Sequence, residues 1–117
     1  MAHKRILIVD DNVSFLHLLE DSIGLFCIDC QVESATDGRA ALKKLAREPF
    51  DLILTDYNMP GMNGLELASV VRQTLPHTPI ILMTGCKDGG ALQDGILALG
   101  LEGYLQKPFD LSQIREL

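Results

Sequence analysis

The chain has 117 residues, a formal net charge of -6 and a hydrophobic fraction of 47%. This length fits one domain, and the composition is that of a folded domain that buries a core without disulfides or a structural metal. The negative charge argues against direct binding of nucleic acid through its phosphates. No apolar run is long enough to span a bilayer, and the N-terminal segment lacks the apolar core of a signal peptide. We therefore expect a cytoplasmic protein that contacts neither membrane nor nucleic acid directly.

Apolar runs of strand length alternate with helix-like segments, a pattern typical of a parallel sheet covered on both faces. The expected elements, in chain order, are a strand over 5–10, a helix over about 13–24, a strand over 31–34, a helix capped by Thr36 or Asp37 that ends before Pro49, a strand over 52–55, a helix over 65–74, a strand over 80–83, a helix over about 91–99, a strand over 103–106 and a helix start over 110–117. The α/β class follows from this alternation.

Two of these helices carry more specific expectations. In the first, four apolar side chains share helical spacing and predict its buried face: Phe15, Leu18, Leu19 and Ile23. The segment over 91–99 is crowded by four glycines, namely Gly89, Gly90, Gly95 and Gly100. Because each interior glycine costs about 1 kcal/mol relative to alanine, we expect this helix to be short or mobile.

Polar residues follow four of the apolar runs. Asp10 and Asp11 follow the first strand, and Asp56 follows the third. Thr84 follows the fourth strand, and Lys107 follows the last. Because ligands of an open parallel sheet bind at the carboxyl ends of its strands, the sequence predicts that these side chains meet at one edge.

The chemistry of this set suits phosphoryl transfer. Neighbouring carboxylates repel one another, and a hard divalent cation such as Mg²⁺, with Mn²⁺ as an alternative, relieves that repulsion through oxygen ligands. The set holds no imidazole or thiolate, which disfavours zinc or copper. A carboxylate can also attack phosphorus to form an acyl phosphate. The metal, Lys107, and either Thr84 or backbone N–H groups would then bind the three phosphoryl oxygens.

Four segments carry a family resemblance. They are 8–12 (IVDDN), 51–64 (DLILTDYNMPGMNG), 81–85 (ILMTG) and 103–109 (GYLQKPF). In this order and spacing the chain resembles the receiver domain of a two-component response regulator over residues 1–117. The resemblance implies a flavodoxin-like, five-stranded parallel sheet in the order 2-1-3-4-5, which the periodicity alone does not supply.

The resemblance also implies how the acidic residues act. Asp56 would accept a phosphoryl group from a histidine kinase or a histidine phosphotransfer protein. Asp11, Asp56 and the backbone carbonyl of Asn58 would bind Mg²⁺ directly, and Asp10 would act through a metal-bound water.

The remaining implied roles concern switching. Lys107 would bind the phosphoryl group, Thr84 would move towards it and Tyr104 would turn inward. The bond between Lys107 and Pro108 would be cis. The fourth helix, fifth strand and fifth helix would form the surface that changes, used for output or for a homodimer. The protein would be a switch rather than an enzyme, catalysing only its own phosphorylation and dephosphorylation.

The segment over 110–117 is shorter than the fifth helix usually is in this family. We therefore expect a fifth helix cut short, ahead of an output domain whose regulated process the sequence does not identify.

Two other function classes require motifs that the chain does not contain. A metal-dependent phosphatase or phosphotransferase of the haloacid-dehalogenase type requires an Asp-x-Asp motif after the first strand, and residues 10–13 read DDNV. A mononucleotide or flavin binder requires a glycine-rich or Walker-type phosphate loop, which the chain lacks.

The three cysteines, Cys27, Cys30 and Cys86, agree with a reducing compartment. Cys27 and Cys30 have CxxC spacing, but a reactive pair places its first cysteine at a helix N-terminus. This pair follows a helix, so we expect inert packing rather than a redox motif.

Overall fold

The computed structural model describes residues 4–85 and 89–107. Its strands are β1 (Lys4–Val9), β2 (Cys30–Ala35), β3 (Leu52–Asp56), β4 (Ile80–Thr84) and β5 (Gly103–Gln106). Its helices are α1 (Val13–Phe26), α2 (Gly38–Arg47), α3 (Gly64–Thr74) and α4 (Gly89–Leu99). The expected alternation is thus confirmed as far as β5. The expected last helix and the cis bond before Pro108 lie outside the described residues.

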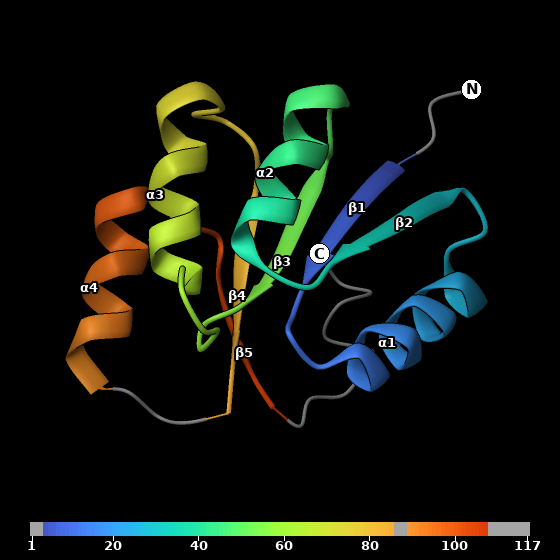
Figure 1. The fold of residues 1–117 in the computed structure, drawn as a ribbon. Helices are drawn as coiled ribbons and strands as arrows, with labels where there is room; N and C mark the ends of the chain where they lie inside the picture. Colours follow the sequence, from blue (N-terminus) through green and yellow to red (C-terminus); the bar gives the residue numbers. More distant parts are fainter. Residues whose placement is uncertain (1–3, 86–88, 108–117) are drawn as a thin grey trace.

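The strands form one five-stranded sheet in the order β2-β1-β3-β4-β5. Every neighbouring pair is parallel, as Figure 1 shows. The expected α/β fold and strand order are therefore confirmed. No helix among the described residues has the length and apolar character needed to cross a membrane.

Alternating side chains of the strands build two cores, one on each face of the sheet. On one face, Leu7, Ile53 and Leu82 pack against α2, α3 and α4. On the other, Ile8 and Leu54 pack against α1. Figure 1 shows α1 apart from the three other helices. Burial on both faces explains why β3 and β4 are almost wholly apolar.

The prediction that Leu18 lies in the buried face of α1 is wrong, because its side chain is 64% exposed. The buried face consists of Leu16, Leu19 and Ile23. These residues are spaced by three and then four positions, which keeps them on one side of a helix, whereas Leu18 falls beside that stripe. Phe15, also expected there, is partly buried against the same core.

Several predicted element boundaries need correction. Asp10 follows β1 instead of ending it, and α4 is an eleven-residue helix that begins at Gly89. One of its glycines has a packing role, because a Cβ on Gly95 would lie 2.6 Å from a methyl carbon of Leu65. The glycine therefore allows α3 and α4 to approach closely, a role that low helix propensity alone does not predict.

Polar side chains fix where three helices begin. Asn12 caps α1, and Asp37, one of the two expected candidates, caps α2. At the start of α3, Asn63 and Glu66 form a capping box in which each side chain accepts a backbone N–H of the other at 2.9 Å. These caps satisfy backbone donors that a helix start otherwise leaves open.

Arg72 ties the C-terminal ends of α3 and α4 together. Its guanidinium donates hydrogen bonds to four backbone carbonyls, those of Leu99 at 2.8 Å, Leu75 at 3.1 Å, Thr78 at 2.7 Å and Gly100 at 3.3 Å. One side chain therefore holds two helix ends and the loop before β4.

We expect Arg72→Ala to lower the free energy of unfolding by about 2 kcal/mol, since hydrogen bonds from a charged donor are lost and carbonyls are left without that partner. Urea denaturation measures the change. Gln73→Ala, at the exposed neighbouring position, is the control and should shift stability by less than about 0.5 kcal/mol. Equal midpoints for the two variants would contradict the role assigned to Arg72.

Candidate functional site

The predicted site residues meet at the carboxyl edge of the sheet. Asp10 and Asp11 follow β1, Asp56 ends β3, Thr84 ends β4 and Lys107 follows β5. One oxygen from each of Asp10, Asp11 and Asp56 lies within 4.8 Å of the others. The expected convergence of three carboxylates is therefore present.

Asp10 is the most enclosed of the three carboxylates, with no exposed surface. Its Oδ1 accepts the backbone N–H of Asn12 at 2.9 Å, and its Oδ2 accepts the ammonium of Lys107 at 2.6 Å. Its own N–H donates to the carbonyl of Ala35 at the end of β2. These contacts hold the carboxylate in one orientation at the junction of β1 and α1.

Asp56 is also buried, at the end of the central strand β3. Burial raises the pKa of this carboxyl above its ordinary value, and the negative charge of Asp10 adds to the shift, while Lys107 opposes it. Asp11, by contrast, is exposed. The ionised form of Asp56 therefore depends on positive charge supplied nearby.

Lys107 supplies the positive charge among the described site residues. Its Nζ lies 2.6 Å from Asp10 Oδ2 and 3.5 Å from Asp56 Oδ1. The same ammonium sits 4.3 Å from the centre of the Phe15 ring, at cation–π distance. Its backbone N–H donates to the Thr84 carbonyl at 2.7 Å, which ties the end of β5 to that of β4. The lysine is thus held at both its backbone and its side chain.

Three other predicted residues border the carboxylates or lie near them in sequence. Thr84 is fully buried at the end of β4. Asn58 is exposed in the loop that follows β3. Tyr104 is 40% exposed on β5, so its ring is in an outward position in this structure. The inward movement of Tyr104 and the carbonyl ligand from Asn58 stay predictions.

Gly64, the last residue of the segment over 51–64, has a structural role in the site. A Cβ at this position would lie 2.5 Å from the backbone oxygen of Asp56 and 3.0 Å from the Cα of Tyr57. The Gly64 N–H also donates to the Tyr57 carbonyl at 2.9 Å. Glycine therefore lets the first turn of α3 pack directly on the backbone of Asp56.

The donor set fits a hard divalent cation. Carboxylate oxygens are the ligands that Mg²⁺ prefers, and it commonly uses one or two of them together with water and phosphate oxygens. One ammonium against three carboxylates leaves negative charge without compensation in the site. A bound cation would balance that charge.

A family model described as the response regulator receiver domain matches residues 6–117. The chain belongs to this family. Domains of this family are signalling switches of two-component systems, controlled by phosphorylation. The expectation drawn from the four sequence segments is confirmed.

The receiver domain resembles both curated proteins and solved structures. It is 40% identical over 119 residues to the response regulator protein PilR of Pseudomonas aeruginosa, a match covering 100% of this chain and 26% of PilR. It is 32% identical over 116 residues to the chemotaxis protein CheY-3 of Vibrio cholerae, covering 97% of this chain and 88% of CheY-3. The response regulator TrrA of Thermotoga maritima, solved in complex with Mg²⁺–BeF, superposes with a TM-score of 0.83 at 31% identity, covering 97% of this chain and 94% of that one.

The receiver domain spans about a quarter of the length of PilR and of FleR, another response regulator of Pseudomonas aeruginosa. The regions of those proteins beyond the match have no counterpart in the 117 residues.

The close packing at Gly64 leads to a prediction about stability. We expect Gly64→Ala to lower the free energy of unfolding by about 1–3 kcal/mol, because the added methyl group must displace the backbone at Asp56. Gly24→Ala is the matched control, since a Cβ there meets nothing within 4 Å in α1. That variant should gain up to about 1 kcal/mol from helix propensity. Chemical denaturation tests both; similar effects for the two variants would contradict the packing argument.

The pKa of Asp56 leads to a prediction about pH. Because its folded pKa is raised, the stabilisation from its protonated form is fully present below the unfolded value of about 4 and is lost as the pH rises through the folded pKa. In chelator, Asp56→Asn should therefore be more stable than the wild type at neutral pH, with the difference shrinking as the pH falls through the folded pKa and absent below about pH 4. Thermal unfolding of both proteins across this range measures it; a difference independent of pH would contradict the assignment.

Proposed function

We propose that this receiver domain accepts a phosphoryl group on Asp56 in a Mg²⁺-dependent reaction and changes its surface in response. The observation that carries the proposal is the meeting of three carboxylates within 4.8 Å and an ammonium that contacts two of them. This combination can hold a cation, supply a nucleophile and bind an anionic group in one place.

The proposed chemistry follows from the positions of these groups. A carboxylate oxygen of Asp56 attacks phosphorus, and the bond between phosphorus and the donor's histidine nitrogen breaks as the acyl phosphate forms. Lys107, 3.5 Å from Asp56 Oδ1, pairs with a phosphoryl oxygen. Asp10 keeps the lysine in place, and water later attacks phosphorus to restore the carboxylate. No separate substrate is turned over, so the domain is a switch rather than an enzyme.

The same side chains form the proposed metal site. Asp11, Asp56 and the Asn58 carbonyl bind the cation directly, and Asp10 binds it through water. When bound, Mg²⁺ neutralises charge that builds up on the phosphoryl oxygens. Its hard-oxygen preference is shared by Mn²⁺, which we expect to substitute for it.

Switching is proposed to run from the acceptor to β5 and α4. Thr84 ends the strand next to β3, and its carbonyl accepts the backbone N–H of Lys107. Its hydroxyl would bind a phosphoryl oxygen, and Tyr104 on the neighbouring strand would turn inward into the space this opens. Phosphorylation would then favour one of two surfaces built from α4, β5 and the segment after Lys107.

The proposed partners follow the family. A histidine kinase or histidine phosphotransfer protein supplies the phosphoryl group, and an output domain or downstream protein reads the α4–β5 surface, which also offers a place for a homodimer. Exposed apolar side chains on α1, including Val13 and Leu18, suit contact with the phosphoryl donor. We place the domain, residues 1–117, in the cytoplasm, with no direct contact to nucleic acid or membrane.

Intact mass after incubation with acetyl phosphate and Mg²⁺ tests the proposal. We expect one added phosphoryl group on the wild type and on Asp21→Asn, an exposed carboxylate of α1 that serves as the control. Asp56→Asn and a chelated wild-type sample should gain nothing. If no adduct accumulates, binding of beryllofluoride with Mg²⁺ separates rapid hydrolysis from an inactive site, and failure of both would overturn the proposal.

A further inference from the structure

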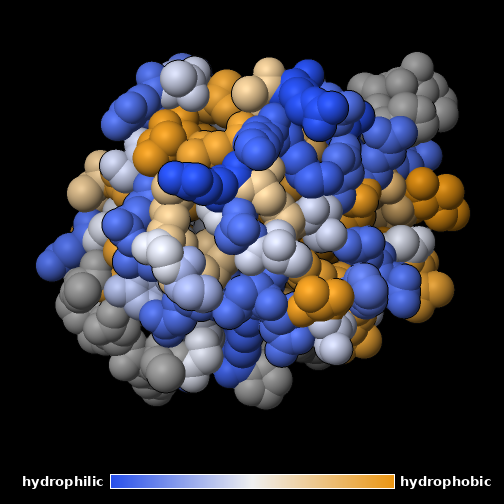
Figure 2. All heavy atoms as spheres, in the orientation of Figure 1, coloured by the Kyte–Doolittle hydropathy of each residue, from blue (hydrophilic) through white to orange (hydrophobic). Residues whose placement is uncertain are grey.

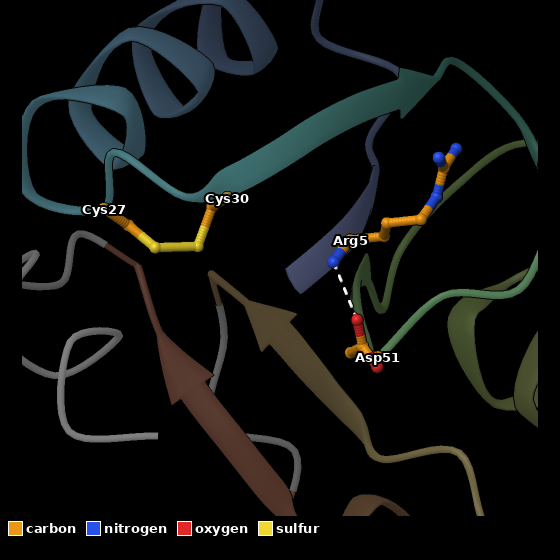
Figure 3. The surroundings of a disulfide bond; sticks show 4 residues. All are labelled: Arg5, Cys27, Cys30 and Asp51. Carbon is orange, nitrogen blue, oxygen red and sulfur yellow. Dashed lines mark hydrogen bonds between the residues drawn. A yellow bond between two sulfur atoms is a disulfide. The ribbon is translucent and has the colours of Figure 1, made fainter. Parts of the chain in front are cut away.

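The pair Cys27 and Cys30 is bonded as a disulfide, contrary to the inert packing expected from the sequence. The bond joins Cys27, the C-cap residue that follows α1, to the first residue of β2, with a Cα–Cα distance of 5.4 Å, inside the range that disulfides adopt. Figure 3 shows the sulfur bridge below the end of α1, close to where β1 begins. The turn between α1 and β2 brings the two cysteine side chains to the same side of the chain, which the spacing alone does not predict.

Backbone hydrogen bonds hold this turn in addition to the disulfide. The Cys27 N–H donates to the Ile23 carbonyl at 2.9 Å, and the Cys30 N–H donates to the Cys27 carbonyl at 3.2 Å. Because the disulfide closes a loop with a sequence separation of only 3, it removes little freedom from the unfolded chain. A bond that adds so little to the global free energy of unfolding acts at most on the local stability of this turn.

The surroundings of the bond make it accessible. Leu25 is 86% exposed and Ile28 is 92% exposed, and both flank the sulfurs in sequence. Cys27 and Cys30 are themselves partly exposed at the border of the core beneath α1. Hydrophobic atoms gather at the right edge of Figure 2, where Figure 1 places the turn between α1 and β2. A reactant can therefore approach this turn from outside.

The electrostatics decide how such a pair reacts. Cys27 lies at the C-terminal end of α1, where the helix dipole disfavours negative charge, and the last turn of α1 carries no basic residue. The adjacent Asp29 adds negative charge when ionised. The end of α1 therefore disfavours a thiolate at Cys27, which favours the disulfide form. Lys4 is the register partner of Cys30 and favours a thiolate there, so Cys30 is the cysteine suited to attack a disulfide when the pair is oxidised.

We propose that Cys27 and Cys30 form a reversible redox site, reduced by dithiols and oxidised by disulfides. In reduction, a thiolate of the dithiol attacks one sulfur, and the other cysteine leaves and takes up a proton. The second thiolate of the reductant then attacks the reductant sulfur of this mixed disulfide and displaces the bound cysteine, which takes up a proton, so the reductant becomes a disulfide and both cysteines become thiols. In a reducing compartment, a disulfide of this kind is of the transient, redox-sensing type.

The Cys27–Cys30 pair lies at the opposite end of the sheet from Asp56. Cys30 pairs with Lys4 at the start of β1, whereas Asp10 follows its end. The six residues of β1 separate them by about 20 Å. Opening the bond therefore loosens the last turn of α1 and the start of β2 without rearranging the carboxylates.

The test uses the Cys86→Ser variant, so that only the proposed pair titrates, in buffers with a graded ratio of reduced to oxidised glutathione. Maleimide labelling in denaturant should change from two thiols to none as the buffer becomes oxidising, and dithiothreitol should restore both. Persistent labelling of two thiols, or glutathione adducts in place of the closed bond, would overturn the proposal.

Amide hydrogen exchange supplies the second arm. Residues 25–31 should exchange several-fold faster in the reduced form, while residues 53–59 around the acceptor should not change. A Cys27→Ser/Cys30→Ser variant should match the reduced form in either buffer. Identical exchange of 25–31 in both states would show that the bond has no structural consequence and would contradict the proposal.

Discussion

The ion pair between Lys107 and Asp10 is the interaction on which the arrangement of the site depends. At 2.6 Å it joins the end of β5 to the end of β1, across the two strands that lie between them. Without that ammonium, three carboxylates would share a small volume with no opposing charge among the described residues. Burial, together with the negative charge of Asp10, raises the pKa of Asp56 above its ordinary value. The site is therefore short of positive charge. A bound cation would supply that charge both to the carboxylates and to an incoming phosphoryl group.

The rest of the molecule keeps this edge in place. Two apolar cores hold the sheet from both faces, and the edge residues are attached to strands that cannot shift without disturbing those cores. Gly64 lets α3 rest on the acceptor backbone, and Arg72 fixes the opposite ends of α3 and α4. The Cys27–Cys30 bond lies at the other edge of the sheet, where β1 and β2 begin. The acidic cluster and the disulfide consequently lie at opposite ends of one sheet.

Much of the candidate site could be predicted, because its side chains stand at the ends of strands or directly after them. Apolar runs locate the strands, and the polar residue after each run must fall at one edge of a parallel sheet. The side of α1 that is buried was not predictable in the same way: Phe15, Leu16, Leu18 and Leu19 are all apolar, and packing against the sheet selects Leu16 over Leu18. The contact at Gly64 and the bond between Cys27 and Cys30 depend on distances through space, which spacing along the chain leaves open.

The central claim is that phosphate becomes attached to Asp56. Reduction of the phosphorylated domain with borohydride, followed by peptide mass mapping, tests it most directly, because an acyl phosphate is converted to the alcohol and aspartate becomes homoserine at the modified position. The account predicts homoserine at residue 56 in the Mg²⁺-treated sample and none in a chelated one. Homoserine at residue 10 or 11, or unmodified aspartate at all three positions in a protein that carries the phosphoryl mass, would contradict it.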